Sequence, residues 1–217
     1  MRWRRRSQDQ QGLTLVEVMV ATSILAVALL IFLSTFASIQ RATSRESDRG
    51  RNNDEARLAV EELDREIRSG NVLYDPAKEN APSEQGGIAS CSGCAPSYTL
   101  RVYTQSNAPT RAGFVCRLWR ITDARELQTQ YWPPLHPEQA SSWRTVATGV
   151  MNRQLAVPAF TRSADLSKAN RTVEILLLVN NDYDNDPGDT VRIQVSLTGR
   201  NTLFGYPEDV CDQVPTS

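Results

Sequence analysis

One long apolar segment near the start of the chain dominates the pattern of hydrophobic and polar positions. From Val18 to Ile39 the sequence runs for 22 residues without a charge. About 20 apolar residues in an α-helix are enough to cross the ~30 Å hydrocarbon core of a bilayer. We therefore predict a single transmembrane helix here, and the sequence turns polar directly after it.

Basic residues precede this segment and predict its orientation. Residues 1–12 contain four arginines and one acidic residue, Asp9. Because basic flanks stay in the cytoplasm, the C-terminal part of the chain is expected outside it. A simple signal peptide or anchor is the alternative, but an ordinary signal has only about 7–15 apolar residues before a small-x-small site. Thr35-Phe36-Ala37 is a poor site of that kind, and the polar Ser7–Gln11 fits poorly with a twin-arginine signal at Arg4-Arg5-Arg6.

A second helical pattern, over residues 54–70, is amphipathic. Its apolar positions recur three or four residues apart, at Ala56, Val60, Leu63 and Ile67. Asn52 with Glu55 suits an N-terminal capping box, and Gly70 suits a C-terminal cap. The two helical segments form either one helix of about 55 residues or two helices, with a kink or break near Gly50–Asn53.

The remainder of the chain has the period-two pattern of β-strands, broken by turn residues. The best hairpin pairs residues 172–180 with residues 190–198, where Val191, Ile193, Val195 and Leu197 alternate with polar residues. Further strands are predicted over 98–104, 114–121, 126–132 and 144–150. We expect one antiparallel sheet that packs on the helix of residues 53–69.

Composition excludes several classes of function. The formal net charge is −1, so the chain lacks the overall positive charge of many nucleic-acid-binding proteins, and no nucleic-acid contact is expected. His136 is the only histidine, which excludes a metal site built on a histidine pair. Ser, Asp and Glu are scattered without a nucleophile motif. The sequence therefore gives no indication of an enzyme.

The four cysteines, Cys91, Cys94, Cys116 and Cys211, all lie in the part expected outside the cytoplasm, where disulfides persist. Three pairings are possible. Cys91–Cys94 as a local bridge and Cys116–Cys211 as a long-range one is the pairing we favour. The Cys-Ser-Gly-Cys spacing is also seen in zinc and redox sites, but a second close pair and a thioredoxin-like context are both missing.

An acidic loop joins the two best strands. Asp182, Asp184 and Asp186 alternate and are followed by Asp189. Oxygen ligands at this spacing in a turn with glycine are what Ca²⁺ prefers. The loop does not fit an EF-hand, which needs glycine and glutamate at the positions that Pro187 and Ile193 occupy here. The alternatives are a calcium site and a solvated turn without metal, and no other cofactor is expected.

One residue is unusual for a plain membrane anchor. Glu17 lies inside the apolar register, after Leu13-Thr14-Leu15-Val16. A carboxylate in hydrocarbon costs a few kcal/mol unless it is paired, so it indicates a function. Upstream, the polar Gln10-Gln11 ends at Gly12, where the absence of a side chain leaves the backbone open to an enzyme.

These residues carry a resemblance to a known family. Gly12-Leu13-Thr14-Leu15-Val16-Glu17-Val18-Met19-Val20-Ala21 resembles the N-terminal processing motif of type IV pilins and type II secretion pseudopilins. The family usually has Phe where this chain has Leu13. The resemblance implies that prepilin peptidase cuts between Gly12 and Leu13 and that Leu13 becomes N-methylated. It also implies that Glu17 pairs with the new N-terminal amine of a neighbouring subunit, or of its own chain, during assembly.

The resemblance also implies a domain organisation and a fold. Residues 1–12 are the leader, 13–39 the transmembrane and filament-core helix, 40–70 its amphipathic continuation, and 71–217 a β-rich head. The fold class is α+β, pilin-like, with the long helix packed on an antiparallel sheet. The chain is expected in the cytoplasmic membrane with its head outside, in contact with lipid, and then in a cell-surface or periplasmic filament with other subunits.

The amphipathic helix followed by a β-rich region is most similar to PilW-like minor pilins and J-type minor pseudopilins. This similarity implies a low-copy structural subunit. A second function, from another class, is a membrane-anchored extracellular binding domain that never polymerises, with calcium or another ligand in its head. Such an anchor would have no use for Glu17.

Overall fold

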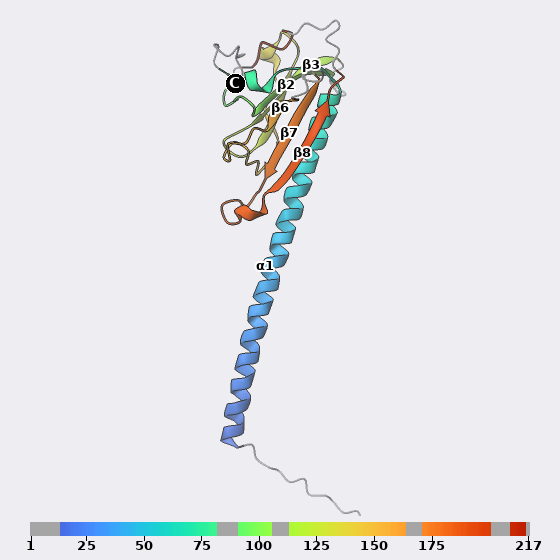
Figure 1. Ribbon diagram of the computed structural model, residues 1–217. Coiled ribbons are helices and arrows are strands. Elements are labelled where there is room, and N and C mark those ends of the chain that lie inside the picture. The colour runs from blue at the N-terminus through green and yellow to red at the C-terminus, as the bar shows by residue number, and fades with distance from the viewer. Residues whose placement is uncertain (1–13, 82–90, 106–112, 164–170, 201–208, 216–217) are drawn as a thin grey trace, which may run out of the picture. The chain divides into compact units, whose positions relative to one another are not determined.

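A computed structural model describes residues 14–81, 91–105, 113–163, 171–200 and 209–215. The chain forms two compact units, one up to Glu46 and the other from Ser47 onward. A single helix, α1, runs from Leu15 to Arg68 without interruption (Figure 1). Of the two arrangements left open by the sequence, the continuous helix is therefore the one found. One glycine, Gly50, costs only about 1 kcal/mol relative to alanine inside a helix, too little to break this one.

Both helix caps predicted for the second segment are wrong. Asn52 and Glu55 lie inside α1, where no free N–H group needs a cap, and their side chains bind the head instead. Gly70 is the first residue of a strand and has no positive φ. A Cβ at Gly70 would lie 2.8 Å from Val102 Cγ1 and 2.9 Å from the Ile67 carbonyl oxygen. Glycine is needed there for close packing and not for a left-handed cap.

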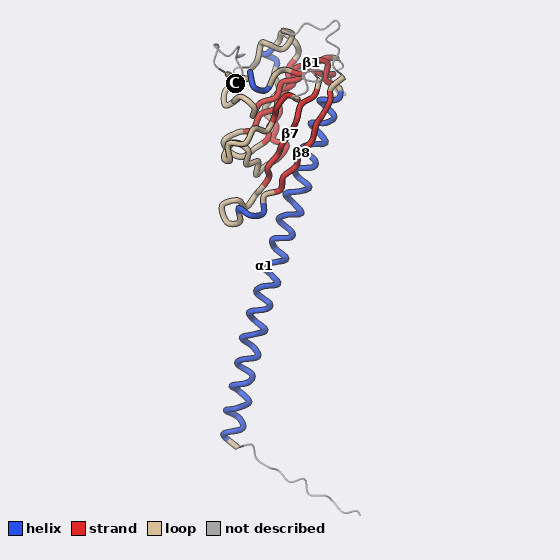
Figure 2. The backbone as a smooth tube through the Cα atoms, viewed as in Figure 1, coloured by secondary structure: helices blue, strands red, loops and turns tan. Residues whose placement is uncertain are grey.

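The head contains two antiparallel sheets (Figures 1 and 2). The first has the order β1-β2-β3-β4-β5, formed by Gly70–Leu73, Thr99–Gln105, Phe114–Ile121, Leu127–Trp132 and Arg144–Ala147. The second has the order β6-β7-β8, formed by Phe160–Arg162, Thr172–Val179 and Val191–Thr198. Short 3-10 helices cover Pro76–Lys78, Pro137–Gln139 and Pro187–Asp189.

The α+β, pilin-like fold class is confirmed, and the hairpin of β7 and β8 forms with Val179 opposite Val191. The expectation of one sheet is wrong. The predicted strand 144–150 ends at Ala147, because Gly149 adopts a φ of +64° and turns the chain. After that turn, Val150 makes an isolated bridge to Val179 at the end of β7. The chain passes through this short connection from the first sheet to the second. Strands β1 and β6 were not predicted from the sequence, because they are too short to show a clear period-two pattern.

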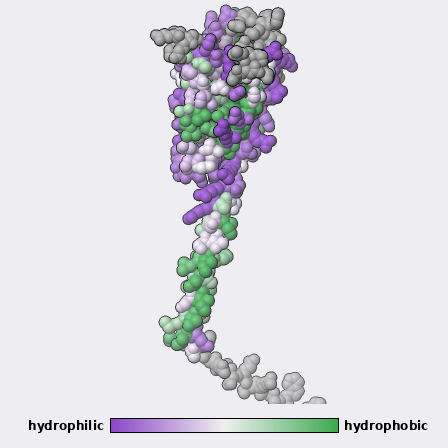
Figure 3. Space-filling view, viewed as in Figure 1, coloured by the Kyte–Doolittle hydropathy of each residue, from purple (hydrophilic) through white to green (hydrophobic). Residues whose placement is uncertain are grey.

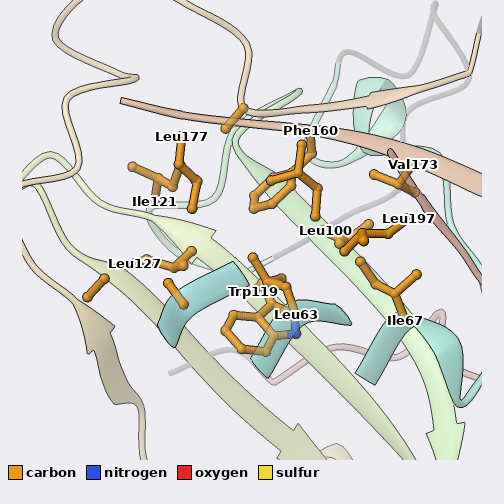
Figure 4. Close-up of a cluster of buried hydrophobic side chains, with 14 of the residues drawn as sticks. Leu63, Ile67, Leu100, Trp119, Ile121, Leu127, Phe160, Val173, Leu177 and Leu197 are labelled. Atoms are coloured by element: carbon orange, nitrogen blue, oxygen red, sulfur yellow. The ribbon is translucent and has the colours of Figure 1, made fainter. Parts of the chain in front are cut away.

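One apolar core is shared by the second half of α1 and both sheets. The helix contributes a buried stripe, Ala56, Ala59, Leu63 and Ile67, of which all but Ala59 had been expected. In Figure 4, side chains from three sources converge: Leu63 and Ile67 from α1, Leu100 and Trp119 from the first sheet, and Val173 and Leu177 from the second. Full burial of one such large side chain contributes about 1.5–3 kcal/mol, so this core fixes the helix to the head.

The opposite face of the first sheet is covered by loops that the disulfides hold. Cys91 bridges to Cys94 and Cys116 to Cys211, the pairing that the sequence analysis favoured. All four cysteines are in these two bridges, so no free thiol is present as a zinc ligand. The Cys116–Cys211 bridge spans a sequence separation of 95 and attaches the C-terminal segment to β3.

Polar contacts reinforce that attachment. Arg101 and Glu79 form an ion pair with a 3.0 Å separation, and both side chains are completely buried. The Arg101 Nη1 group donates to the Cys211 carbonyl oxygen at 2.6 Å, and the Cys211 amide donates to the Tyr74 hydroxyl oxygen at 3.0 Å. The guanidinium carbon of Arg101 lies 4.3 Å from the centre of the Tyr74 ring. Arg101 also pairs with Asp212 at 3.6 Å, so one covalent bond, two hydrogen bonds and an ion pair hold the C-terminal segment.

We expect the head to lose stability in alkali through Tyr74. Burial raises the pKa of Tyr74 to about 12 from an ordinary value of 10.0. Because the folded-state pKa is the higher one, the stabilisation is complete below pH 10 and is lost as the pH rises through 12. Two pKa units correspond to about 3 kcal/mol at most. Denaturant unfolding of the full chain in detergent between pH 9 and 12 measures the slope of the free energy of unfolding against pH. Tyr74→Phe should flatten it, and an unchanged slope would contradict the assignment.

Candidate functional site

The first part of α1 exposes a continuous apolar surface. Large side chains from Leu15 to Ile39 are roughly half exposed or more, including Ile24, Leu30 and Phe32. Among the described residues, α1 is the one helix that is long and apolar enough to cross a membrane, and none of that stretch is buried (Figure 3). Soluble monomers rarely expose contiguous apolar patches larger than a few hundred Å². Lipid or other apolar helices are the surroundings that suit such a surface.

Four of the five hydroxyl groups between Val18 and Ile39 are satisfied inside the helix. Thr22 donates to the Val18 carbonyl oxygen at 2.9 Å, and Ser23 donates to that of Met19 at 2.7 Å. Ser34, Thr35 and Thr43 bond to preceding carbonyl groups in the same way. Such groups are compatible with an apolar environment because they leave no hydrogen bond unmade. Glu17 is then the only ionisable side chain between Thr14 and Gln40.

Glu17 closes the first turn of α1. The backbone N–H and the hydroxyl of Thr14 both donate to Glu17 Oε2, at 3.0 and 2.9 Å. In return, the Glu17 amide approaches the Thr14 hydroxyl oxygen at 3.4 Å. This reciprocal arrangement is a capping box, with Thr14 as the cap and Glu17 three positions later. The Thr-x-x-Glu spacing predicts it, although the capping box was expected at Asn52 and Glu55 instead.

The capping box leaves part of the carboxylate available. Both hydrogen bonds converge on Oε2, and within the described residues Oε1 accepts none. A cation near the helix N-terminus could therefore bind Oε1 without displacing Thr14. The expected cleavage site at Gly12 and Leu13 lies outside the described residues, and its processing stays a prediction.

Comparison with known families bears on this segment. Residues 7–33 match the family model of the prokaryotic N-terminal methylation motif. The matched stretch contains Gly12, Leu13 and Glu17 and supports the resemblance to type IV pilins and pseudopilins. It does not reach the head, and it does not separate pilins from pseudopilins or point to one subgroup. Comparisons with curated proteins and with solved structures find no significant match.

The acidic loop is organised by arginines. Both carboxylate oxygens of Asp184 accept from Arg125, at 2.9 and 3.1 Å, and Arg125 holds the pKa of Asp184 below its ordinary value. Asp189 pairs with Arg49 of α1 at 2.7 Å. Asp182 accepts from Asn185, and the backbone carbonyl of Asp186 accepts from Asn180. In the described part of the chain, no three Asp, Glu, His or Cys side chains gather as metal ligands.

The start of this loop is attached to the middle of α1. Asn181 donates through its side chain to Asn52 Oδ1 at 2.9 Å and to Glu55 Oε2 at 2.8 Å. The Thr148 amide donates to Glu55 Oε1 at 2.8 Å. Gly149 permits the close approach, since a Cβ there would lie 2.5 Å from Asn181 Oδ1. The contacts join residues between 93 and 129 positions apart, and no local pattern in the sequence signals them.

The arginine pairs predict that the loop does not need metal. Because Asp184 and Asp189 already have cationic partners, we expect the full chain in detergent to melt at the same temperature in millimolar calcium and in chelator. The matched variant Arg125→Gln leaves Asp184 without its partner, so the effect of calcium on the melting temperature can be compared with and without this ion pair. A higher melting midpoint of the unaltered chain in calcium would instead support the calcium hypothesis, which stays a prediction.

Proposed function

We propose that this protein is a structural subunit, a minor pilin or pseudopilin, of a type IV pilus or type II secretion pseudopilus. The observation that carries the proposal is the match of residues 7–33 to the N-terminal methylation motif. Two further observations support it. The first part of α1 exposes an apolar surface that other helices can cover, and Glu17 is its single charge.

The proposed sequence of events begins in the cytoplasmic membrane, with the arginine-rich N-terminus inside and the head outside. Prepilin peptidase removes residues 1–12, and Leu13 then carries a free, methylated and positively charged amine. Helices of neighbouring subunits replace lipid around the apolar surface of α1. In that apolar bundle the Leu13 amine pairs with Glu17, through the oxygen that Thr14 leaves available.

Such a pair would set the axial register of the subunit. Removing one partner of a buried ion pair costs about 3–5 kcal/mol, because the remaining charge is left uncompensated. A subunit displaced along its neighbours would suffer that cost, whereas apolar contacts alone tolerate sliding. The head, fixed to α1 by the shared core and by Asn52 and Glu55, is then presented on the filament surface.

We further propose a low-copy role, in the group of PilW-like minor pilins or J-type pseudopilins, on the basis of the helix and β-rich head. The test is fractionation of the host cell. In cells with active prepilin peptidase, a small amount of the chain should copurify with sheared or pulled-down filaments. In peptidase-deficient cells all of it should stay in the membrane. A processed protein that stays monomeric in the membrane would favour the alternative of an anchored binding domain.

A further inference from the structure

A cavity of about 410 Å³ lies in the head between α1 and the first sheet. Its walls include Glu62 and Arg65 of α1, Arg117 of β3, Thr129 and Tyr131 of β4, and Arg144 of β5. All these residues belong to the second compact unit. The site is therefore formed by one folded body, remote in sequence from the processing motif.

The charges around this cavity do not balance. Arg144 pairs with Glu62, and Arg117 Nε lies 3.3 Å from Glu66 Oε2. Arg65 approaches the same Glu66 carboxylate only to 3.9 Å. Among the described residues, three guanidinium groups thus face two carboxylates, and the excess is one positive charge. Burial lowers the pKa of Arg117, because its charged form is incompletely solvated in this position.

A polar group on the wall has no hydrogen-bond partner in the described part of the head. Thr129 is 2% exposed, and its hydroxyl makes no hydrogen bond within the described residues. Unsatisfied buried hydroxyl groups are destabilising, and a ligand that accepts a hydrogen bond from this one would remove that cost. The Arg117 guanidinium carbon also lies 5.4 Å from the centre of the Tyr131 ring, which adds an aromatic surface to the site.

We propose that this cavity binds a carboxylate group, held by Arg65, Arg117 and the Thr129 hydroxyl. Arginine presents a planar fork of donors that matches the two oxygens of a carboxylate. A monocarboxylate compensates the single excess charge, whereas a phosphate dianion would leave negative charge behind. The carboxylate comes from a small organic acid or from an acidic side chain of a peptide. The inference concerns the head alone and is independent of filament assembly.

Titration of the full chain in detergent with benzoate tests the proposal. Ionic strength is kept constant, and neutral benzamide serves as the matched ligand. We expect benzoate to bind measurably by saturation-transfer NMR and benzamide not to bind. A capped Ala-Glu-Ala peptide forms the second arm. Tighter binding of the peptide than of benzoate identifies a side chain as the natural source, and the reverse identifies a small acid.

The variant Thr129→Val separates an effect on benzoate binding from an effect on the stability of the head. The substitution preserves shape and removes an unpartnered hydroxyl, so the melting midpoint should not fall. Benzoate affinity should nevertheless fall by about tenfold, the usual effect of one hydrogen bond to a charged group. Arg65→Gln should also weaken binding, and Arg57→Gln, an exposed arginine two turns earlier on α1, should leave it unchanged. Equal binding of benzoate and benzamide, or unaltered benzoate affinity in Thr129→Val, would overturn the proposal.

Discussion

Glu17→Gln is expected to leave membrane insertion and cleavage intact and to abolish most incorporation into filaments. Glutamine can still accept from the Thr14 amide and hydroxyl, so the capping box survives. What it loses is the negative charge that pairs with the Leu13 amine. An uncompensated amine in an apolar bundle costs about 3–5 kcal/mol, or a reduction of at least a hundredfold in the equilibrium for incorporation.

Glu17→Val provides the comparison, because it removes both the charge and the cap. If assembly depends on charge, the two variants should be equally defective in the filament fraction while their membrane levels stay normal. Should Glu17→Gln assemble like the unaltered chain and Glu17→Val fail, Glu17 acts as a helix cap only. Normal assembly of both variants would remove any role for this residue in the filament.

The second large effect is expected from the long-range disulfide. Replacing Cys116 and Cys211 by alanine should lower the free energy of unfolding by roughly 4–5 kcal/mol, since the bridge closes a loop with a sequence separation of 95. Replacing Cys91 and Cys94, which are separated by only 3 positions, should cost about 1.6 kcal/mol in the same chain-entropy model. Both pairs are buried, so the two variants compare loop length at similar burial.

Denaturant unfolding of the full chain in detergent, without reductant, measures the loss of unfolding free energy in both double variants. The Cys116→Ala, Cys211→Ala variant should also lose the order of the C-terminal segment, visible as faster hydrogen exchange at the Cys211 position. Non-reducing peptide mapping establishes the pairing first. Equal destabilisation by the two double variants would show that loop closure does not govern the contribution of these bridges.

Local patterns predicted much of this fold. The charge-free run gave the first part of α1, and spacing of three and four gave Leu63 and Ile67 on its buried side. Period-two alternation located β3 at its observed bounds and β7 and β8 to within a residue or two. These elements share one property: their apolar residues are arranged by the element's own periodicity, so a short window of sequence contains the information.

Contacts between residues far apart in the sequence could not be predicted from such a short window. Asn52 and Glu55 look like a helix cap locally, but a continuous α1 leaves them free to bind Asn181 and Thr148. In sequence the acidic loop resembles a set of metal ligands, but in the fold Arg125 and Arg49, from distant parts of the chain, pair with Asp184 and Asp189. The division into two sheets likewise depends on the turn at Gly149, which places Val150 against β7.

The intact mass of the protein extracted from membranes with active prepilin peptidase tests the central claim most directly. We predict a chain that begins at Leu13, lacks residues 1–12 and carries one added methyl group on its N-terminal amine. The same measurement in peptidase-deficient cells should give the full, unmethylated chain. Retention of residues 1–12 in cells whose peptidase processes other substrates would contradict the assignment of this protein as a pilin-like subunit.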